Sequence, residues 1–358
     1  MTKETHRLKI GVVGCGPIAQ FAHFDACRKA RNAELYAICD VADDLVTAMA
    51  AIHKPSVTYT EYEQMLNDPL VDAIIIATSD PYHAPLSLQA IAAGKHVLVE
   101  KPLGTNIEEC EDLRRRVKAS GLVFQVGHNR RFDPGLAFVH RFLRHEVGQR
   151  MGLKYWYYDS IHRYTMTDNL LPQVVSSSRA RRHADDPKAN KQRYFLLTHG
   201  SHLVDSARYF GGEIAKVRAR HLERFGAHCW FIDVDFADGT LGHLDMTIAI
   251  RGDFEEGFQV YGEHGSAAGK VFLPWYHKAS VVECFSAKDR QFRRPLGEDS
   301  YTYKLQIEAF ADTILHQSPQ CGANIDDGVA TMQAMVAIAC SARTGESMPL
   351  TSMTGGIA

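Results

Sequence analysis

The first stretch whose residue types suggest chemistry is a glycine-rich hexapeptide, Gly14-Cys15-Gly16-Pro17-Ile18-Ala19, directly after the apolar run of residues 8–13. It fits the pattern G-x-G-x-x-A of a dinucleotide-binding turn. The first glycine would permit a tight turn, and the second would let the backbone approach a pyrophosphate at a helix N-terminus. We therefore expect four residues to contact the cofactor here: Gly14, Gly16, Pro17 and Ile18.

An acidic residue, Asp40, ends a second apolar strand-like run at residues 34–39. A carboxylate at this distance from the glycine turn accepts hydrogen bonds from the adenosine ribose and repels a 2′-phosphate. Residues 41–44 contain no Arg or Lys, so the sequence favours NAD over NADP. A helix N-cap is the alternative interpretation of Asp40, and it is compatible with ribose binding.

Strand-like and helix-like segments alternate through the first 127 residues, which predicts an α/β domain with a parallel sheet of the Rossmann type. The segment Thr105-Asn106-Ile107-Glu108 predicts a capping box at the start of one helix. Parallel sheets bind ligands at the carboxyl ends of their strands. Five further candidate residues fall at those ends: Thr78, His83, Glu100, Lys101 and Asn129.

The composition excludes several classes of protein. A chain of 358 residues is too long for one ordinary core, which predicts two domains. The formal net charge of −2 favours neither nucleic acid nor an anionic membrane as a partner. No apolar run approaches the roughly 20 residues that span a bilayer, and no signal peptide is evident. The scattered cysteines predict reduced thiols in a cytoplasmic protein with no metal site.

The chain resembles the Gfo/Idh/MocA family of oxidoreductases, which is named for glucose–fructose oxidoreductase, inositol dehydrogenase and the rhizopine-catabolism protein. The most specific part of the resemblance is Glu100-Lys101-Pro102 after a buried strand. The other segments that carry it are Gly14 to Ala19, Ala77 to His83, Ala93 to Val99, Val126 to Phe132, Gly200 to Asp205 and Tyr209 to Gly212.

The resemblance implies a Rossmann domain at residues 1–127 and an α+β domain at residues 128–358, built on a large open, mostly antiparallel sheet. The sequence agrees, because Asp238-Gly239 between two apolar runs is a strong hairpin signal, and two helices are expected near residues 303–316 and 327–343. The family also implies that the exposed face of this sheet packs against a partner subunit. We therefore expect a homodimer or a homotetramer.

For catalysis, the resemblance implies that Lys101 contacts the nicotinamide ribose and the substrate hydroxyl. Relatives that oxidise inositol and sugars usually carry Asp-x-Gly-x-His-x-x-Asp, where this sequence has Thr198-His199-Gly200-Ser201-His202-Leu203-Val204-Asp205. His202 matches and is our first candidate for the general acid/base. Thr198 cannot tune a base as a carboxylate does, although its hydroxyl could hold a substrate oxygen. We expect His199 to have an accessory role.

Two enzymatic interpretations stay open. The first is an NAD-dependent dehydrogenase acting on a secondary hydroxyl of a sugar, sugar derivative or cyclic polyol. The Thr-His-Gly at residues 198–200 also resembles NAD-dependent glycoside hydrolases, which oxidise a sugar transiently, eliminate the aglycone, add water and reduce again. A sensor without catalysis is disfavoured, because Lys101 and His202 are both present.

A basic, polar stretch at residues 176–193 lies where relatives place a loop over the active site. Most such stretches are simply solvated. The sharper hypothesis is that Arg179 and Arg181 bind an anionic substituent of the sugar. Upstream of this stretch, Tyr164 could stack on a sugar ring. The expected substrate-binding set is Lys101, Thr198, His199, His202, Tyr164, Arg179 and Arg181.

Overall fold

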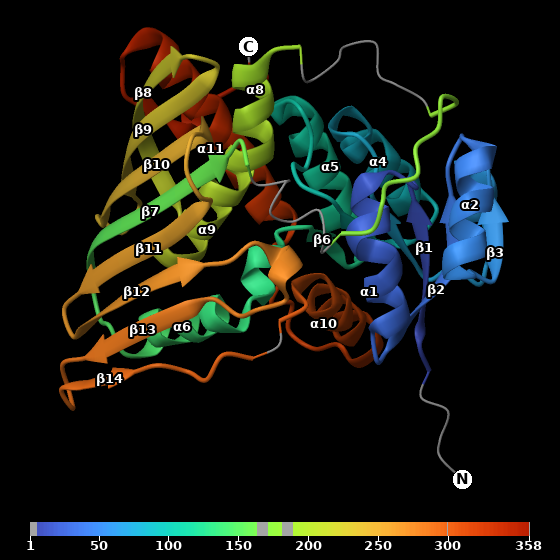
Figure 1. Cartoon of the computed structure of the whole chain (residues 1–358), viewed down its shortest axis with the longest axis horizontal. Coiled ribbons are helices and arrows are strands. Elements are labelled where there is room, and N and C mark those ends of the chain that lie inside the picture. The colour runs from blue at the N-terminus through green and yellow to red at the C-terminus, as the bar shows by residue number, and fades with distance from the viewer. Residues whose placement is uncertain (1–5, 163–170, 181–188, 299, 358) are drawn as a thin grey trace. The chain divides into compact units, whose positions relative to one another are not determined.

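The computed structural model describes residues 6–162, 171–180, 189–298 and 300–357 (Figure 1). It divides into two compact units, each described by itself below. Unit 1 comprises Met1–Asn129, Leu171–Asp186 and Tyr303–Val329, and unit 2 comprises Arg130–Leu170, Pro187–Thr302 and Ala330–Ala358.

Unit 1 contains a six-stranded parallel sheet, which confirms the predicted Rossmann-type sheet. Its strands are β1 (Leu8–Val13), β2 (Ala33–Cys39), β3 (Val57–Tyr59), β4 (Ala73–Ile76), β5 (His96–Val99) and β6 (Phe124–Val126), in the spatial order β3-β2-β1-β4-β5-β6. The chain order reverses between β1 and β4. Ligands of doubly wound sheets bind at such a switch point, beyond the carboxyl ends of the strands.

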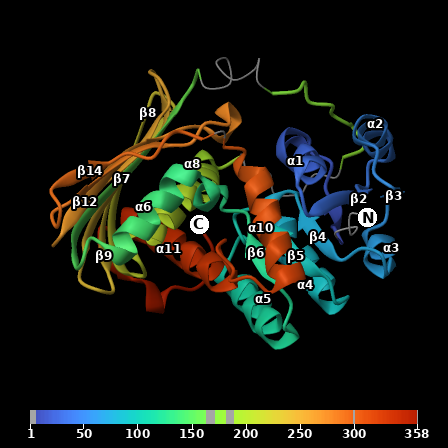
Figure 2. The ribbon, with the colours of Figure 1, turned by 90° about the horizontal axis from the view of Figure 1, so that it is seen from below.

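Helices cover both faces of this sheet, with α4 and α5 on one face and α1 on the other (Figure 2). The central strands are therefore apolar on both sides, as Ile10, Ile74 and Leu98 show by their complete burial. The helices of unit 1 are a π-helical turn η1 (Ala19–His23), α1 (Phe24–Lys29), α2 (Asp43–His53), α3 (Tyr62–Asn67), the 3₁₀ turn η2 (Asp80–Tyr82), α4 (His83–Ala92), α5 (Ile107–Ser120) and α10 (Thr302–His316).

The capping box of α5 lies one residue later than the sequence predicted. Asn106 is the N-cap, and its side chain accepts a hydrogen bond from the backbone N–H of Glu109 at 2.9 Å. The Glu109 carboxylate accepts in return from the N–H of Asn106 at 3.0 Å. The hydroxyl of Thr105 also donates to Glu109, so the residue expected to be the cap supports it instead.

Unit 1 also includes two segments that the sequence analysis assigned to the second domain. The later segment returns to the edge of the parallel sheet, where the N–H of Val126 in β6 donates to the carbonyl of Ala323 at 2.8 Å. The Gln320 side chain donates to the carbonyl of Phe124 at 2.9 Å. Such long-range pairing leaves no local signal, and a single boundary at residue 127 does not describe this division.

Unit 2 is built on a nine-stranded sheet in the order β14-β13-β12-β11-β7-β10-β9-β8-β15. All its pairings are antiparallel except that of β7 with β10, which confirms the predicted mostly antiparallel sheet. The strands are β7 (Arg150–Ser160), β8 (Ile214–Arg224), β9 (Ala227–Phe236), β10 (Leu241–Ile250), β11 (Glu255–Gly262), β12 (Gly265–Val271), β13 (Val281–Ser286), β14 (Gln291–Arg293) and β15 (Met348–Pro349).

The hairpin predicted at Asp238-Gly239 joins β9 to β10, and Gly239 adopts the positive φ of +89° that favours glycine. Helices pack on one face of the sheet, which Figure 2 shows nearly edge-on. The helical elements of unit 2 are η3 (Asn129–Phe132), α6 (Pro134–His145), α8 (Lys191–Phe195), the π-helical turn η4 (Leu196–Gly200), α9 (Ser201–Gly211), η5 (Pro274–Tyr276), most of α11 (Ile325–Thr344) and η6 (Leu350–Ser352).

Candidate active site

The glycine turn after β1 has the backbone that a dinucleotide requires. Gly14 has φ of +93°, and a Cβ there would lie 2.6 Å from the carbonyl oxygen of Ala77 after β4. Gly16 faces open space, since a Cβ on it would meet no atom within 4 Å. Pro17 and Ile18 form the first turn of the helix that follows. Open backbone at a helix N-terminus fits a pyrophosphate group.

Asp40 connects the end of β2 to this turn. Its Oδ2 accepts a hydrogen bond from the N–H of Cys15 at 2.8 Å, and its Oδ1 accepts from the N–H of Ala42 at 3.0 Å. Asp40 is not the N-cap of α2, because Ala42 occupies that position. Each carboxylate oxygen keeps a second acceptor site, so the fixed carboxylate can still receive ribose hydroxyls.

The residues after β4 fix the neighbouring loop. Both ring nitrogens of His83 face backbone carbonyls, with Nδ1 2.6 Å from the oxygen of Pro102 and Nε2 3.0 Å from that of Thr78. The ring thereby bridges the loop after β4 and the loop after β5. The Thr78 hydroxyl oxygen is buried and has no hydrogen-bond partner among the described residues. It is a polar atom that a bound ligand could satisfy.

Glu100 ends β5 and is only 5% exposed. Its Oε1 accepts a hydrogen bond at 2.8 Å from Nε2 of His23, a fully buried residue of η1. Burial raises the pKa of this carboxyl group, but the hydrogen bond and charge of His23, with the nearby charges of Lys101 and His83, outweigh it. The net pKa of Glu100 is therefore lowered. A buried carboxylate thus lies under the loop that carries Lys101.

Lys101 and Asn129 complete the group in unit 1. Lys101 is half-buried, and its backbone N–H donates to Glu100 Oε2 at 3.2 Å. Asn129 follows β6 and is 1% exposed. Because β4, β5 and β6 are adjacent in the sheet, the structure brings Thr78, Lys101 and Asn129 to the carboxyl ends of three neighbouring strands.

In unit 2, three predicted site residues lie on consecutive helical turns. Thr198 and His199 belong to the π-helical turn η4, and His202 lies in the first turn of α9. Single π turns inside helices are frequent at functional sites. The Thr198 hydroxyl donates to the carbonyl of Tyr194 one turn earlier, so its proton is directed into the helix.

Tyr157 and Asp159 of β7 face these histidines, and Asp159 was not predicted from the sequence. His199 Nδ1 is 3.5 Å from Oδ2 of Asp159 and 3.5 Å from the hydroxyl of Tyr157. The Tyr157 ring lies 5.6 Å from the ring of His199 and 6.4 Å from that of His202, nearly parallel to the latter. Tyr157 is therefore shared by the two histidines, and His199 has a carboxylate beside it.

A signal for Asp159 was present in the sequence. On β7 the alternate residues Leu153, Tyr155, Tyr157 and Asp159 are buried. A carboxylate in the buried register of an alternating strand is costly unless it has a partner. A second carboxylate nearby, Asp205 of α9, accepts two hydrogen bonds from the Arg131 guanidinium, at 2.7 and 3.0 Å, and anchors the helix.

Three further residues were predicted to bind substrate: Arg179, Tyr164 and Arg181. Arg179 belongs to unit 1, where its guanidinium pairs with Asp43 of α2 at 2.5 Å. The hydrogen bond from Arg179 lowers the pKa of the Asp43 carboxyl group. Tyr164 and Arg181 lie outside the described residues. Within the described ranges, no cluster of three or more His, Cys, Asp or Glu side chains is arranged to hold a metal ion.

A doubly wound sheet with this glycine turn defines unit 1 as a dinucleotide-binding domain of the kind found in oxidoreductases. Comparison with known families agrees. Residues 8–128 match the model described as "Oxidoreductase family, NAD-binding Rossmann fold", and residues 168–268 match the GFO/IDH/MocA C-terminal domain. The chain belongs to the Gfo/Idh/MocA family, and it is an NAD-binding oxidoreductase.

Several individual relatives are distantly similar to this chain over nearly its full length. The chain is 25% identical to the uncharacterized oxidoreductase YrbE of Bacillus subtilis, over 89% of this chain and 90% of the relative. It is 25% identical to an inositol 2-dehydrogenase of Rubrobacter xylanophilus, over 96% and 94%. An oxidoreductase structure from Agrobacterium radiobacter, in complex with NAD+, L-tartaric acid and magnesium, superposes with a TM-score of 0.79 at 16% identity over 97% of this chain and 99% of that one.

No helix in the described parts of the chain combines the length and the apolar character that crossing a membrane requires.

Proposed function

We propose that this protein is a dehydrogenase that transfers a hydride between NAD and a secondary hydroxyl of a sugar, a sugar derivative or a cyclic polyol. The observation that carries the proposal is the group on unit 2, where His199 and His202 share Tyr157 and Asp159 lies beside His199. Such a group can accept and hold a hydroxyl proton. The similarity to an inositol 2-dehydrogenase supports a cyclic polyol as the substrate class.

The proposed roles in unit 1 follow from the strand ends. The turn at Gly14, Gly16, Pro17 and Ile18 would hold the pyrophosphate of NAD, and Asp40 its adenosine ribose. When bound, NAD supplies the hydride acceptor. Lys101 would donate a hydrogen bond to the substrate oxygen and stabilise negative charge that develops on it. His83 and Glu100 position this lysine through the loop after β5.

In unit 2, we assign proton removal from the substrate hydroxyl to His202. Asp159 would replace the carboxylate that relatives usually carry at the position of Thr198. A carboxylate beside Nδ1 of a histidine fixes its tautomer and stabilises its charged form. His199 would thereby hold a second proton near the substrate, relayed by the hydroxyl of Tyr157.

We also propose a homodimer or homotetramer that forms through the open face of the nine-stranded sheet. Among the described residues no helix covers this face, and its side chains include the exposed Phe231 and Leu241. All eight cysteines are free, which is compatible with the cytoplasm as the proposed compartment.

The test uses the purified protein with NAD+ and a panel of free sugars, inositols and aryl glycosides. Absorbance at 340 nm follows NADH, and aglycone release is followed in parallel. NADH formed in proportion to the consumed substrate supports the proposal. Aglycone release with catalytic NAD+ and no accumulation of NADH would contradict it and identify a redox-neutral glycoside hydrolase.

A further inference from the structure

A segment distant in sequence, residues 171–179, is attached to the dinucleotide-binding turn of unit 1. Its first anchor is Gln20, a 6% exposed residue of η1. The Gln20 side-chain amide donates to the carbonyl of Val175 at 2.9 Å, and its oxygen accepts from the N–H of Val175 at 3.0 Å. The same amide donates to the carbonyl of Cys15 at 2.8 Å. One buried side chain therefore ties the segment to the glycine turn.

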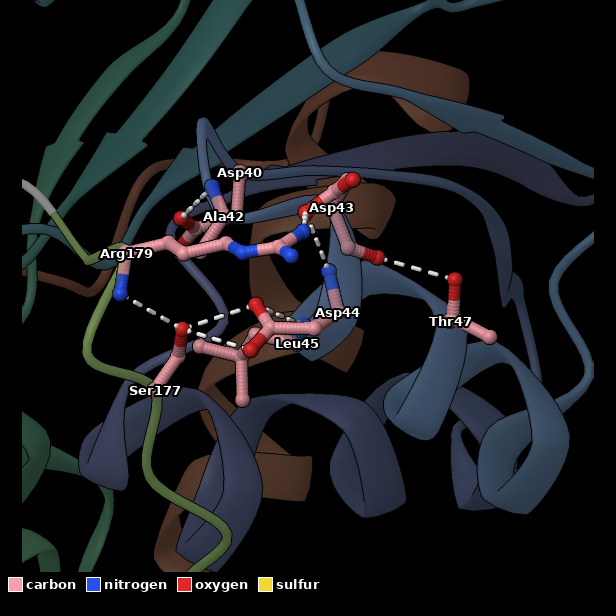
Figure 3. A network of polar contacts seen from close by, with 8 residues as sticks. All are labelled: Asp40, Ala42, Asp43, Asp44, Leu45, Thr47, Ser177 and Arg179. Carbon is pink, nitrogen blue, oxygen red and sulfur yellow. Dashed lines mark hydrogen bonds and ion pairs between the residues drawn. The ribbon is translucent and has the colours of Figure 1, made fainter.

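The second anchor is the N-terminus of α2 (Figure 3). The Ser177 hydroxyl donates to the Asp44 carboxylate, with its oxygen 2.7 and 2.9 Å from the two carboxylate oxygens, and it accepts from the N–H of Arg179 at 2.9 Å. The Arg179 side chain extends over the same helix end to Asp43. Two acidic residues at a helix N-terminus thus each have a partner in the segment.

Between the two anchors lies the carboxylate of Asp40. It is bonded to Cys15 on the side of the Gln20 anchor and to Ala42 on the side of the α2 anchor. Figure 3 draws its hydrogen bond with Ala42 at the start of α2, in the same view as the second anchor. The segment therefore spans the part of unit 1 where the ribose carboxylate joins the glycine turn.

The two anchors differ in strength. The side chains of Arg179 and Asp43 are 63% and 62% exposed, and such ion pairs contribute little at physiological salt. The Gln20 side chain is buried and its two bonds with Val175 are part-buried, and leaving a buried amide without its partner is costly. Gln20 and Val175 are therefore the main attachment, and Ser177 and Arg179 orient the end of the segment.

We propose that residues 171–179 form part of the cofactor site and cover the adenosine half of the bound dinucleotide. In this role Gln20, Val175 and Ser177 control how fast NAD(H) leaves. Arg179 then acts on the cofactor side, through Asp43, in place of the substrate contact expected from the sequence. The inference rests on NAD binding alone and does not depend on the substrate proposed above.

The first test removes the backbone donor of the segment and leaves the glycine turn intact. Val175→Pro removes the backbone N–H that donates a hydrogen bond to the Gln20 side chain. The matched control is Val174→Pro, one residue earlier. We expect NADH to leave Val175→Pro about threefold to tenfold faster, in line with the loss of one part-buried hydrogen bond. The measurement is the fall of NADH fluorescence after mixing with excess NAD+, with Kd from titration.

The second test is milder and serves if the proline variant unfolds, which its thermal melt would show. Ser177→Ala is compared with Ser176→Ala, because Ser177 bonds Asp44 whereas Ser176 lies one residue away on the same exposed stretch. We expect a twofold to threefold faster release for Ser177→Ala only, the scale of one exposed hydrogen bond.

Hydrogen exchange supplies a readout that is independent of affinity. NAD+ is expected to slow exchange in the peptide of residues 171–180 in the wild-type protein. NADH release that matches the controls in both variants, or exchange of this peptide that is unchanged by NAD+, would overturn the proposal. In that case the segment is only a surface strap.

Discussion

His199 Nδ1 lies 3.5 Å from Oδ2 of Asp159, a residue at the end of β7 that is 5% exposed. His199 follows Thr198, the position at which the resemblance to the family implies a carboxylate. In the proposed function, Asp159 of the sheet would provide the carboxylate that Thr198 cannot. This arrangement gives the departure from the family pattern a physical meaning that can be tested.

Asp159→Asn is expected to reduce kcat by about 10- to 100-fold with little change in KM, because an amide cannot stabilise a charged His199. Steady-state rates at a single pH, with the substrate concentration varied, measure kcat and KM separately. The control is Asp245→Asn, which replaces a carboxylate that bonds Tyr158 in the same sheet. Equal effects of both substitutions would indicate a structural role.

Lys101→Met keeps the length of the side chain and removes its charge. We expect kcat to fall by at least about 100-fold, the scale of losing one group that stabilises developing charge. NADH binding should stay within a few-fold, because the turn at Gly14 and Gly16 is unaffected. Fluorescence titration separates the two quantities, and Lys118→Met, on the surface of α5, is the control. A variant that turns over normally would remove Lys101 from the reaction.

The open sheet face of unit 2 predicts the oligomeric state. Phe231 is 42% exposed on β9, and an arginine there would bring a charge into a subunit interface. Phe231→Arg is expected to yield monomers by light scattering at micromolar concentration. Ile52→Arg, at an exposed position of α2 in unit 1, should leave the assembly unchanged. An unchanged assembly for Phe231→Arg would show that this face is not the interface.

The parts of the molecule that the sequence predicted are those fixed by local patterns. The glycine turn, the parallel strands and the hairpin at Asp238-Gly239 each depend on residues close together in the chain. Strand β3 has only three residues, too few for a periodicity, and it was not predicted. The same limit explains why the return of residues 320–323 to β6 was not anticipated.

Part of the candidate site follows from local sequence patterns in the same way. The polar residues at strand ends follow from the topology of a parallel sheet, so Lys101 and Asn129 could be singled out. The partners of His199 could not, because Tyr157 lies 42 positions away and meets it only through the register of β7 and the π turn η4. Arg179 was expected to touch substrate because of its charge. Its pairing with Asp43, 136 positions away in the chain, leaves no local signal in the sequence.

Asp40→Ser tests the preference for NAD. Removing the carboxylate removes its repulsion of a 2′-phosphate and its bonds to the ribose, so the ratio of kcat/KM for NADP+ to that for NAD+ should rise about 10-fold or more. Most of the change should come from weaker NAD+ binding, because Cys15 also loses an acceptor. Kinetics with both cofactors measure the ratio. Asp112→Ser on the surface of α5 should leave it unchanged, and an unchanged ratio for Asp40→Ser would show that another residue selects the cofactor.

The buried pair of His23 and Glu100 predicts a pH-dependent stability. The folded-state pKa of Glu100 is lowered, so its contribution to stability is complete above the unfolded-state pKa of about 4.3 and is lost as pH falls through the folded value. His23→Leu removes the hydrogen bond and the charge that oppose the effect of burial on Glu100, so the folded-state pKa of Glu100 rises. The unpaired buried carboxylate then lowers the stability by about 3–5 kcal/mol near neutral pH.

The loss of stability in His23→Leu should therefore be largest at pH 7 to 8 and should shrink towards pH 5, as Glu100 takes up a proton. Thermal unfolding of the wild-type and variant proteins across this range measures the difference. Adding Glu100→Gln to the variant removes the titrating group, so the double variant should lose this dependence on pH. A difference between wild type and His23→Leu that stays constant with pH would mean that His23 contributes only through packing, such as its edge-on contact with Tyr303.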